Sequence, residues 1–298
     1  MQFVSHPFEG VISIVVEDGS RIYWWTHAAV VDPTTRGIGK RYEMKLRYAG
    51  STHVGMKRAH NEDSFFLLAQ ENLYIVADGM GGHASGEVAS KIAVETLANF
   101  FIDTSRDREV TLPYKEDKSL NYDQNRLITG IKLANRRVYE TSQSDGRLRG
   151  MGTTLVAMLL AESGVYIGHV GDSRAYCLSD GGINQVTEDH SLLNDYLKVH
   201  QLSQEEIENF PHKNVIVRAL GMKEAVEVDI FRNEPKPGSS FLLCSDGLSG
   251  MVTDEQIHEL FMQADGDPEK GCQSLIAKAN ANGGTDNVTV VLVSFEED

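Results

Sequence analysis

Several short apolar runs in this chain stop at, or start beside, an aspartate whose neighbours are Gly, Ser or Asn. They read YIVADG, YIGHVGDS, FLLCSDG and GGTDNVTVV, and their aspartates are Asp78, Asp172, Asp246 and Asp286. A fifth segment, RAHNEDSFFLL, places Glu62 and Asp63 directly before an apolar run. Runs of this length and composition predict buried strands. The fold must therefore accommodate carboxylates at the ends of several strands.

One aspartate beside a strand is most often a turn former, because its side chain bonds nearby backbone amides. Five such segments together have a different meaning. Strand ends in stacked sheets converge on one edge, where like charges repel and burial adds to the cost. Hard divalent cations between the carboxylates would relieve that repulsion, and no His or Cys cluster accompanies them. The pattern therefore predicts a Mg²⁺ or Mn²⁺ site and disfavours zinc.

The glycines that follow Asp78 allow a second interpretation. Glycine-rich turns after strands often cradle phosphate through their backbone amides. The recurrence of aspartate at the other strand ends favours the cation site, with the Gly79 carbonyl available as a further ligand because glycine permits close approach.

The expected elements occur in groups of like kind. Strands fall together over residues 45–78 and again over 153–187, and helical periodicity comes in two pairs, 84–101 with 124–143 and 253–265 with 268–284. This grouping predicts antiparallel sheets with helices outside, an α+β layered domain, rather than βαβ alternation. We expect one domain over residues 45–298. Residues 1–44 form an N-terminal extension whose role the sequence does not assign.

Composition narrows the function classes. The formal net charge of -15 argues against a general nucleic-acid binder, which needs a basic face. Three widely spaced cysteines show no zinc spacing and suit a reducing cytoplasm. The longest apolar run near the N-terminus, VISIVV, is too short for a signal peptide core or a membrane span. We expect a soluble cytoplasmic protein without nucleic-acid or membrane partners.

Eight motifs occur along the chain in a fixed order: RAHNED, VADGMGGH, MGTTLVAMLL, GHVGDSRAY, TEDHS, VRALG, LLCSDGLSG and GGTDNVTVV. Together they resemble the metal-dependent protein serine/threonine phosphatases of type 2C, in their bacterial form. The resemblance runs from about residue 48 to the end. It implies a four-layer α/β/β/α fold, in which an antiparallel β-sandwich is flanked by helices.

The resemblance also implies a site with two Mn²⁺ or Mg²⁺ ions. Asp78 would bridge both ions and the Gly79 carbonyl would bind one of them. Asp246 and Asp286 would complete the other. A water shared by two dications loses its proton near neutral pH and can attack phosphorus in line.

Three further residues carry catalytic roles by the same resemblance. Glu62 and Asp63 would hold metal-bound waters and orient the nucleophile. Arg58 would bind the phosphate, because its planar guanidinium matches two phosphate oxygens at once.

Four residues are expected in supporting positions. Asn287 would support the Asp286 turn. Asp172 would cap a turn at the sheet edge, although a place near the metals stays open. His190 would lie near the site or anchor the flap, residues 189–225, that shapes substrate access. His83 is expected to be structural, because Met80 stands where some family members carry a histidine directly after Asp-Gly.

A third metal ion is expected to bind weakly, in an altered way, or not at all. Many bacterial relatives have an Asp just before the GTT segment and another just after ALG, whereas this chain has Arg149-Gly150-Met151 and Met222 there.

The resemblance predicts hydrolysis of phosphoserine and phosphothreonine in proteins, reversing a cognate Ser/Thr kinase in signalling, by a monomeric enzyme. Two alternatives stay open. One is a non-catalytic relative that binds phosphoproteins, although such relatives typically lose metal-binding acids that this chain retains. The other is a hydrolase of small phosphomonoesters, for which no nucleotide-recognition motif is present.

Overall fold

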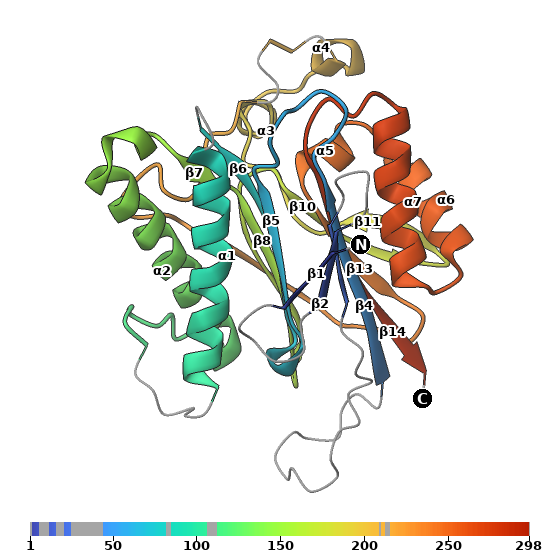
Figure 1. Ribbon diagram of the computed structural model, residues 1–298, viewed down its shortest axis with the longest axis horizontal. Coiled ribbons are helices and arrows are strands. Elements are labelled where there is room, and N and C mark those ends of the chain that lie inside the picture. The colour runs from blue at the N-terminus through green and yellow to red at the C-terminus, as the bar shows by residue number, and fades with distance from the viewer. Residues whose placement is uncertain are drawn as a thin grey trace, which may run out of the picture.

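The structure is a computed structural model, and it describes residues 2–5, 12–15, 21–24, 44–81, 85–105, 112–208, 210–211 and 215–297. Two antiparallel sheets form its centre (Figure 1). The larger sheet has eight strands in the order β1-β2-β3-β4-β14-β13-β10-β11. Their bounds are β1 Gln2–Ser5, β2 Ile12–Val15, β3 Arg21–Trp24, β4 Met44–His53, β14 Val288–Glu297, β13 Ser240–Cys244, β10 Arg174–Ser179 and β11 Gly182–Gln185.

The smaller sheet has six strands, with β7 paired to β6 beside the main path β12-β9-β8-β6-β5. Their bounds are β12 Asp229–Asn233, β9 Gly164–Val170, β8 Leu155–Ala161, β7 Gly152–Thr153, β6 Leu73–Met80 and β5 Asp63–Leu68.

Helices cover the outer face of each sheet (Figure 1). α1 (Ser85–Thr104) and α2 (Tyr122–Ser144) pack on the smaller sheet, and their apolar side chains form one core cluster with β6, β8 and β9. α5 (Asp246–Ser249), α6 (Asp254–Ala264) and α7 (Pro268–Ala281) form a second cluster with β10, β13 and β14 of the larger sheet. The remaining short helices are η1 (Ala69–Glu71), η2 (Gly146–Leu148), α3 (Leu192–Leu197) and α4 (Gln204–Glu208).

The central strands are buried on both faces, and their side chains alternate between two cores. In β14, Val291 and Val293 face the other sheet, whereas Val290 and Leu292 pack against the helices. Alternate side chains of a strand point to opposite faces, so such a strand must be apolar throughout. This alternation produces the four layers α/β/β/α.

The layered α+β sandwich expected from the sequence is confirmed by the two antiparallel sheets and their flanking helices. The sequence did not indicate β12, whose residues alternate weakly, or the short strand β7. Within residues 1–44, three short strands extend the larger sheet beyond β4. The domain boundary at residue 45 stays a prediction. Among the helices that the structure describes, none has the length and apolar character needed to span a bilayer.

Ile131 tests the packing of α2 on the smaller sheet. Its side chain is fully buried in the cluster shared with α1. Ile131→Ala should lower the free energy of unfolding by about 2–5 kcal/mol, because the cavity cannot fully collapse. Urea unfolding would measure this loss. Arg137→Ala, an exposed position on the same helix, should leave stability close to wild type. Equal stability of the two variants would contradict this packing.

Candidate metal centre and catalytic site

The expected carboxylates meet at one edge of the sandwich. Asp63 opens β5 and lies directly opposite Asp78 near the end of β6. From the other sheet, Asp246 follows β13 at the start of α5, and Asp286 lies just before β14. Because β13 and β14 are antiparallel neighbours, the end of one and the start of the other share an edge. We call Asp63, Asp78, Asp172, Asp246 and Asp286 the carboxylate edge.

Asp63 is held by hydroxyl groups. Ser245 Oγ and Thr289 Oγ1 donate to its Oδ2 at 2.8 and 2.7 Å. Its Oδ1 is buried and has no hydrogen-bond partner among the residues that the structure describes. Burial raises the pKa of Asp63 to about 7, against the lowering effect of the two hydroxyls, and the charges of Asp246 and Asp286 raise it further. Asp63 is therefore a buried acid held in one position, with its Oδ1 available to bind a further group.

The backbone of Asp78 is fixed by a pair of threonines. Its amide donates to Thr154 Oγ1 at 3.0 Å, and its carbonyl accepts from Thr153 Oγ1 and from the Thr154 amide, both at 2.8 Å. Burial raises the pKa of Asp78 well above its usual range, and the charges of Asp63, Asp246 and Asp172 add to the effect. The Asp78 carboxylate is thus a point on which several negative charges converge.

Asp172 belongs to the same group of charges. It is buried, and within the described part of the chain its Oδ1 has no hydrogen-bond partner. Burial raises its pKa to about 7, with a further contribution from Asp246. Burial also raises the pKa of Asp246, and the charge of Asp286 raises it further. The structure therefore places Asp172 with the metal-ligand candidates. The turn-capping role expected for Asp172 stays a prediction.

Arg58 lies at the exposed rim of the carboxylate edge. Its Nη2 lies 2.6 Å from Asp286 Oδ2, and the two side chains are 52% and 34% exposed. This arrangement brings the expected phosphate-binding cation to the expected metal ligand. In this structure the guanidinium compensates part of the negative charge at the rim.

Asn287 fastens the loop that carries Arg58 and Glu62. Its Nδ2 donates to the carbonyls of Val54 and His60, both at 2.9 Å, and its Oδ1 accepts from the Glu62 amide at 2.8 Å. Its own amide also donates to Asp286 Oδ1 at 2.8 Å, which closes the turn there. The residue therefore orders two parts of the site at once, which is more than the single turn expected from the sequence.

Gly79 is required by close packing. Its amide donates to the Glu62 carbonyl at 3.1 Å, and a Cβ at this position would overlap the Gly86 carbonyl. Gly86, in the first turn of α1, in turn lies against the Glu62 carboxylate. Burial raises the pKa of Glu62, and the charge of Arg58 opposes that rise. The bare backbone after Asp78 thus lets β6, α1 and the Glu62 loop approach one another.

His190 is a buried anchor at the base of residues 189–225. Its Nδ1 accepts from the Gly171 amide at 3.0 Å, so Nε2 carries the hydrogen that faces Asp229 Oδ2 at 3.2 Å. Arg218 donates to the other oxygen of Asp229 at 2.6 Å. These bonds fit the anchoring role expected for His190. His83 lies outside the described residues.

Met222 occupies the position after ALG where many relatives have a third-metal aspartate, and its side chain is apolar. Met222 is 53% exposed, and its thioether lies close enough to Gly152 to contact a Cβ placed there. The loop that carries it is held from α2, because Asn135 accepts from the Gly221 amide at 2.9 Å and donates to the Lys223 and Glu224 carbonyls.

The donor set fits hard divalent ions, although the described residues contain no three acidic, imidazole or thiol groups already arranged around one point. Asp286 is bonded to Arg58 instead. The fit rests on two buried carboxylate oxygens, Asp63 Oδ1 and Asp172 Oδ1, which have no hydrogen-bond partner among the described residues, and on the raised pKa values of Asp78 and Asp246 beside them. Oxygen donors of this kind suit Mg²⁺ and Mn²⁺.

Sequence reasoning missed the hydroxyl residues of the site. Thr153 and Thr154 in GTT, Ser245 before Asp246, and Thr289 in NVTVV all contact the acids or their backbone. Their signal was present, since each is a small polar residue within an otherwise apolar strand or beside its end, where a buried hydroxyl needs a partner.

Comparisons with known proteins agree with this arrangement. The sequence profile of the family described as Protein phosphatase 2C matches residues 49–268. The chain is 40% identical over 245 residues to the serine/threonine phosphatase stp of Listeria monocytogenes, covering 81% of this chain and 93% of the relative. It is 34% identical over 250 residues to protein phosphatase PhpP of Streptococcus pneumoniae, covering 83% and 96%.

Solved structures show the same relationship. The serine/threonine phosphatase PstP/Ppp of Mycobacterium tuberculosis matches with a TM-score of 0.72 and 36% identity over 84% of this chain and 99% of that one. The catalytic domain of PstP in complex with two manganese ions matches with a TM-score of 0.70 and 35% identity, over 84% and 98%. The chain therefore belongs to the protein phosphatase 2C family, and it is a metal-dependent protein serine/threonine phosphatase with a dinuclear metal site.

Proposed function

We propose that the carboxylate edge is the dinuclear site and that its ions are Mn²⁺ or Mg²⁺. Asp78, the Gly79 carbonyl, Asp246 and Asp286 would hold them. The observation that carries the proposal is the convergence of Asp63, Asp78 and Asp246 where both sheets meet, at positions where burial raises the pKa of all three and the charges of neighbouring carboxylates add to the effect. The two manganese ions of the PstP catalytic domain support the number of ions.

Divalent ions at this edge would lower the pKa of water and offset the negative charge of a phosphoryl group. Asp63, positioned by its two hydroxyl donors, would accept a hydrogen bond from the attacking water and hold it in line with phosphorus. Glu62, at the other side of the Gly79 turn, would orient the same water. Their fixed positions supply the alignment that in-line displacement requires.

Arg58 would bind the phosphate group of the substrate. Its side chain is half exposed at the rim and forms an ion pair with a carboxylate. The guanidinium is therefore already oriented to bind the oxygens of an incoming phosphate. The ion pair with Asp286 would also keep the Arg58 side chain at the carboxylate edge when no phosphate is bound. Asp172 would take part in the outer part of the metal site through its free oxygen.

The substrates of the relatives are indicated by their names as serine/threonine phosphatases. We propose that this chain acts on phosphorylated proteins made by a cognate Ser/Thr kinase, as a monomer in the cytoplasm. Three cysteines without disulfide bonds support a reducing compartment. The net charge of -15 supports the absence of a nucleic-acid partner, and we also propose that no membrane partner is involved. Residues 189–225 would act as the flap over the substrate.

The catalytic reading is favoured over a phosphoprotein-binding role without activity. All four proposed ligand positions keep their oxygen donors, and Asp63 and Arg58 also lie at the same edge. The names of the relatives, which are serine/threonine phosphatases, favour a protein substrate over a small phosphomonoester.

Asp246→Asn tests the metal-ligand assignment. The change keeps the shape of the side chain and removes the charge that holds a cation, so the rate of phosphate release from a phosphothreonine peptide with Mn²⁺ should fall by at least about 10²-fold. The thermal unfolding temperature in chelator should not fall, because the change also removes a repulsive charge.

Asp180→Asn provides the matched control, since this aspartate is exposed in the β10–β11 turn. It should keep wild-type activity. Wild-type rates in Asp246→Asn, or wild-type activity of the native chain in excess chelator, would refute the assignment.

The pH dependence of stability tests the electrostatics of the edge without an activity assay. Asp63 and Asp172 have folded-state pKa values of about 7, above the ordinary aspartate value of about 3.9. Between these values the folded chain binds more protons than the unfolded chain, so stability is lost as pH rises. Each group contributes up to about 1.4 kcal/mol per pH unit in that window.

We therefore expect the unfolding temperature in chelator to fall from pH 5 to pH 7.5, and Mn²⁺ to reduce that fall. Asp63→Asn should flatten the chelator curve. A curve in chelator that rises over this range, or that is the same in Asp63→Asn, would show that the acids are not crowded as described.

A further inference from the structure

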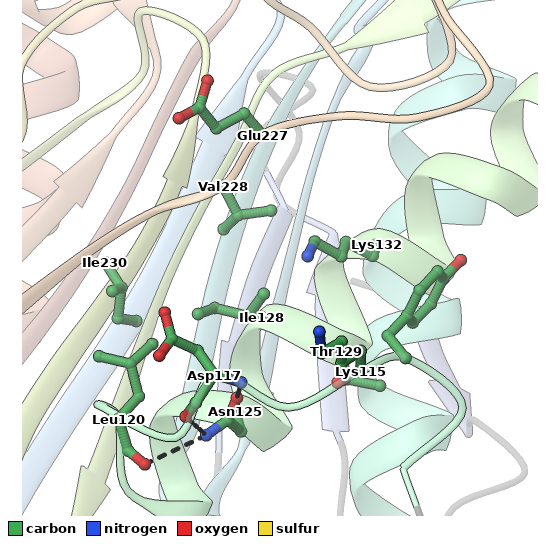
Figure 2. Close-up of a pocket in the computed structure, with 11 residues that line it drawn as sticks. Lys115, Asp117, Leu120, Asn125, Ile128, Thr129, Lys132, Glu227, Val228 and Ile230 are labelled. Carbon is green, nitrogen blue, oxygen red and sulfur yellow. Dashed lines mark hydrogen bonds between the residues drawn. The ribbon is translucent and has the colours of Figure 1, made fainter.

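A second hollow lies on the helical side of the smaller sheet, away from the carboxylate edge. It is bounded by the first half of α2, by the loop of residues 114–120 that leads into α2, and by residues 227–230 at the start of β12 (Figure 2). Its volume is about 350 Å³, within the range of about 300–1,000 Å³ typical of small-molecule sites. No residue of the carboxylate edge lines it.

The walls of this pocket combine apolar and polar side chains. Leu120, Ile128, Val228 and Ile230 line one side of it, and Figure 2 shows them together around the same opening. The two β12-side residues and Ile128 are only partly buried. An apolar molecular body in this space would therefore remove hydrophobic surface from water, which is favourable at about 25 cal/mol per Å².

Two ammonium groups border the apolar wall. Lys115 and Lys132 line the pocket, and in the described part of the chain neither forms an ion pair. The Lys132 ammonium lies 5.8 Å from the centre of the Tyr114 ring, and Figure 2 shows it directed across the opening toward Val228. Unpaired cations at an apolar pocket favour an anionic group on the ligand.

The two acids at the pocket are already engaged. The Asp117 carboxylate accepts from the Ser119 amide and hydroxyl at 2.8 and 2.6 Å, and these bonds lower its pKa. Glu227 is 82% exposed and lies 3.8 Å from Arg218; in Figure 2 its carboxylate points away from the apolar wall. Both acids stay anionic, but neither forms an ion pair with Lys115 or Lys132 among the described residues, so the two ammonium groups can still bind an anionic group of a ligand.

A threonine hydroxyl supplies a further polar contact. Thr129 lines the pocket and is 3% exposed, and its hydroxyl forms no hydrogen bond within the described residues. Its neighbour Asn125, by contrast, uses its amide fully on the carbonyls of Asp117, Leu120 and Asn121. The Thr129 hydroxyl can therefore donate a hydrogen bond to a ligand in the pocket, or accept one from it.

We propose that this pocket is a second binding site, for a small amphipathic anion. The apolar body of the ligand lies against Leu120, Ile128 and Val228. Its carboxylate, sulfonate or phosphate group is bound by Lys132 and Lys115, and Thr129 donates to a ligand oxygen. None of the proposed metal ligands or catalytic residues lines this site.

The location gives such a ligand a physical connection to the flap. Asp229, which lies between the pocket residues Val228 and Ile230, is bonded to His190 and Arg218 at the base of residues 189–225. One turn beyond Lys132, Asn135 holds the loop at Gly221. A bound ligand therefore tightens α2 against the segment that returns from the flap.

The probe for the test is 8-anilinonaphthalene-1-sulfonate, a small aromatic anion whose fluorescence rises in apolar pockets. Titration of the folded, Mn²⁺-loaded chain should give saturable binding of one molecule per chain. Inorganic phosphate at the concentration that inhibits the phosphatase should not displace it, because phosphate lacks the apolar body that the pocket binds. The neutral analogue N-phenyl-1-naphthylamine should bind at least about 10-fold more weakly.

Variants locate the site. The double change Lys115→Met and Lys132→Met keeps the apolar stems and removes both charges, and it should weaken binding of the sulfonate by at least 10-fold, about 1.4 kcal/mol. Thr129→Val should weaken it several-fold. Lys118→Met, an exposed lysine in the same loop, is the matched control and should bind as wild type. All three should retain wild-type phosphatase activity without the probe.

Amide hydrogen exchange adds a readout that does not depend on the variants. With the sulfonate bound, exchange should slow within residues 112–132 and 224–230. Absence of saturable binding to the folded chain, unchanged affinity in the double variant, displacement by phosphate, or slowed exchange only elsewhere would each overturn the proposal.

Discussion

The repulsion among carboxylates at one edge of the sandwich is the constraint on which the rest of the site depends. Asp63 and Asp78 are cross-strand neighbours, and the charges of Asp172 and Asp246 act on the same point. Such a group is stable only if protons or cations compensate it. The fold holds the carboxylates close together, so divalent cations can compensate their charge. Such an edge can therefore serve as a dinuclear phosphatase site.

The two sheets make this possible because each contributes rigid strand ends to the same edge. Small hydroxyl and amide side chains then fix the acids: Ser245 and Thr289 hold Asp63, and Asn287 connects the Glu62 loop to Asp286. Most of these contacts cross between segments more than 180 residues apart in the sequence. The precision of the site therefore comes from tertiary packing of the sandwich, whose alternating strands are buried on both faces.

Much of this could be predicted from the sequence. Asp-ended apolar runs indicated both the strands and their common edge, and the grouping of strands and helices indicated the layers. Other features depend on distant contacts and have no local signal. The Arg58–Asp286 pair and the role of Asn287 in the Glu62 loop are of this kind. β12 was missed because its pairing with β9, rather than its own alternation, defines it.

Metal counting tests the central claim most directly. Mn²⁺ titrated into metal-free chain and followed by calorimetry should bind as two ions per chain, with any third ion much weaker. Asp78→Asn should weaken binding of both ions by at least about 10-fold, with an unfolding temperature in chelator no lower than wild type. Unchanged stoichiometry and affinity in Asp78→Asn, or three equally tight ions in the wild type, would contradict the account.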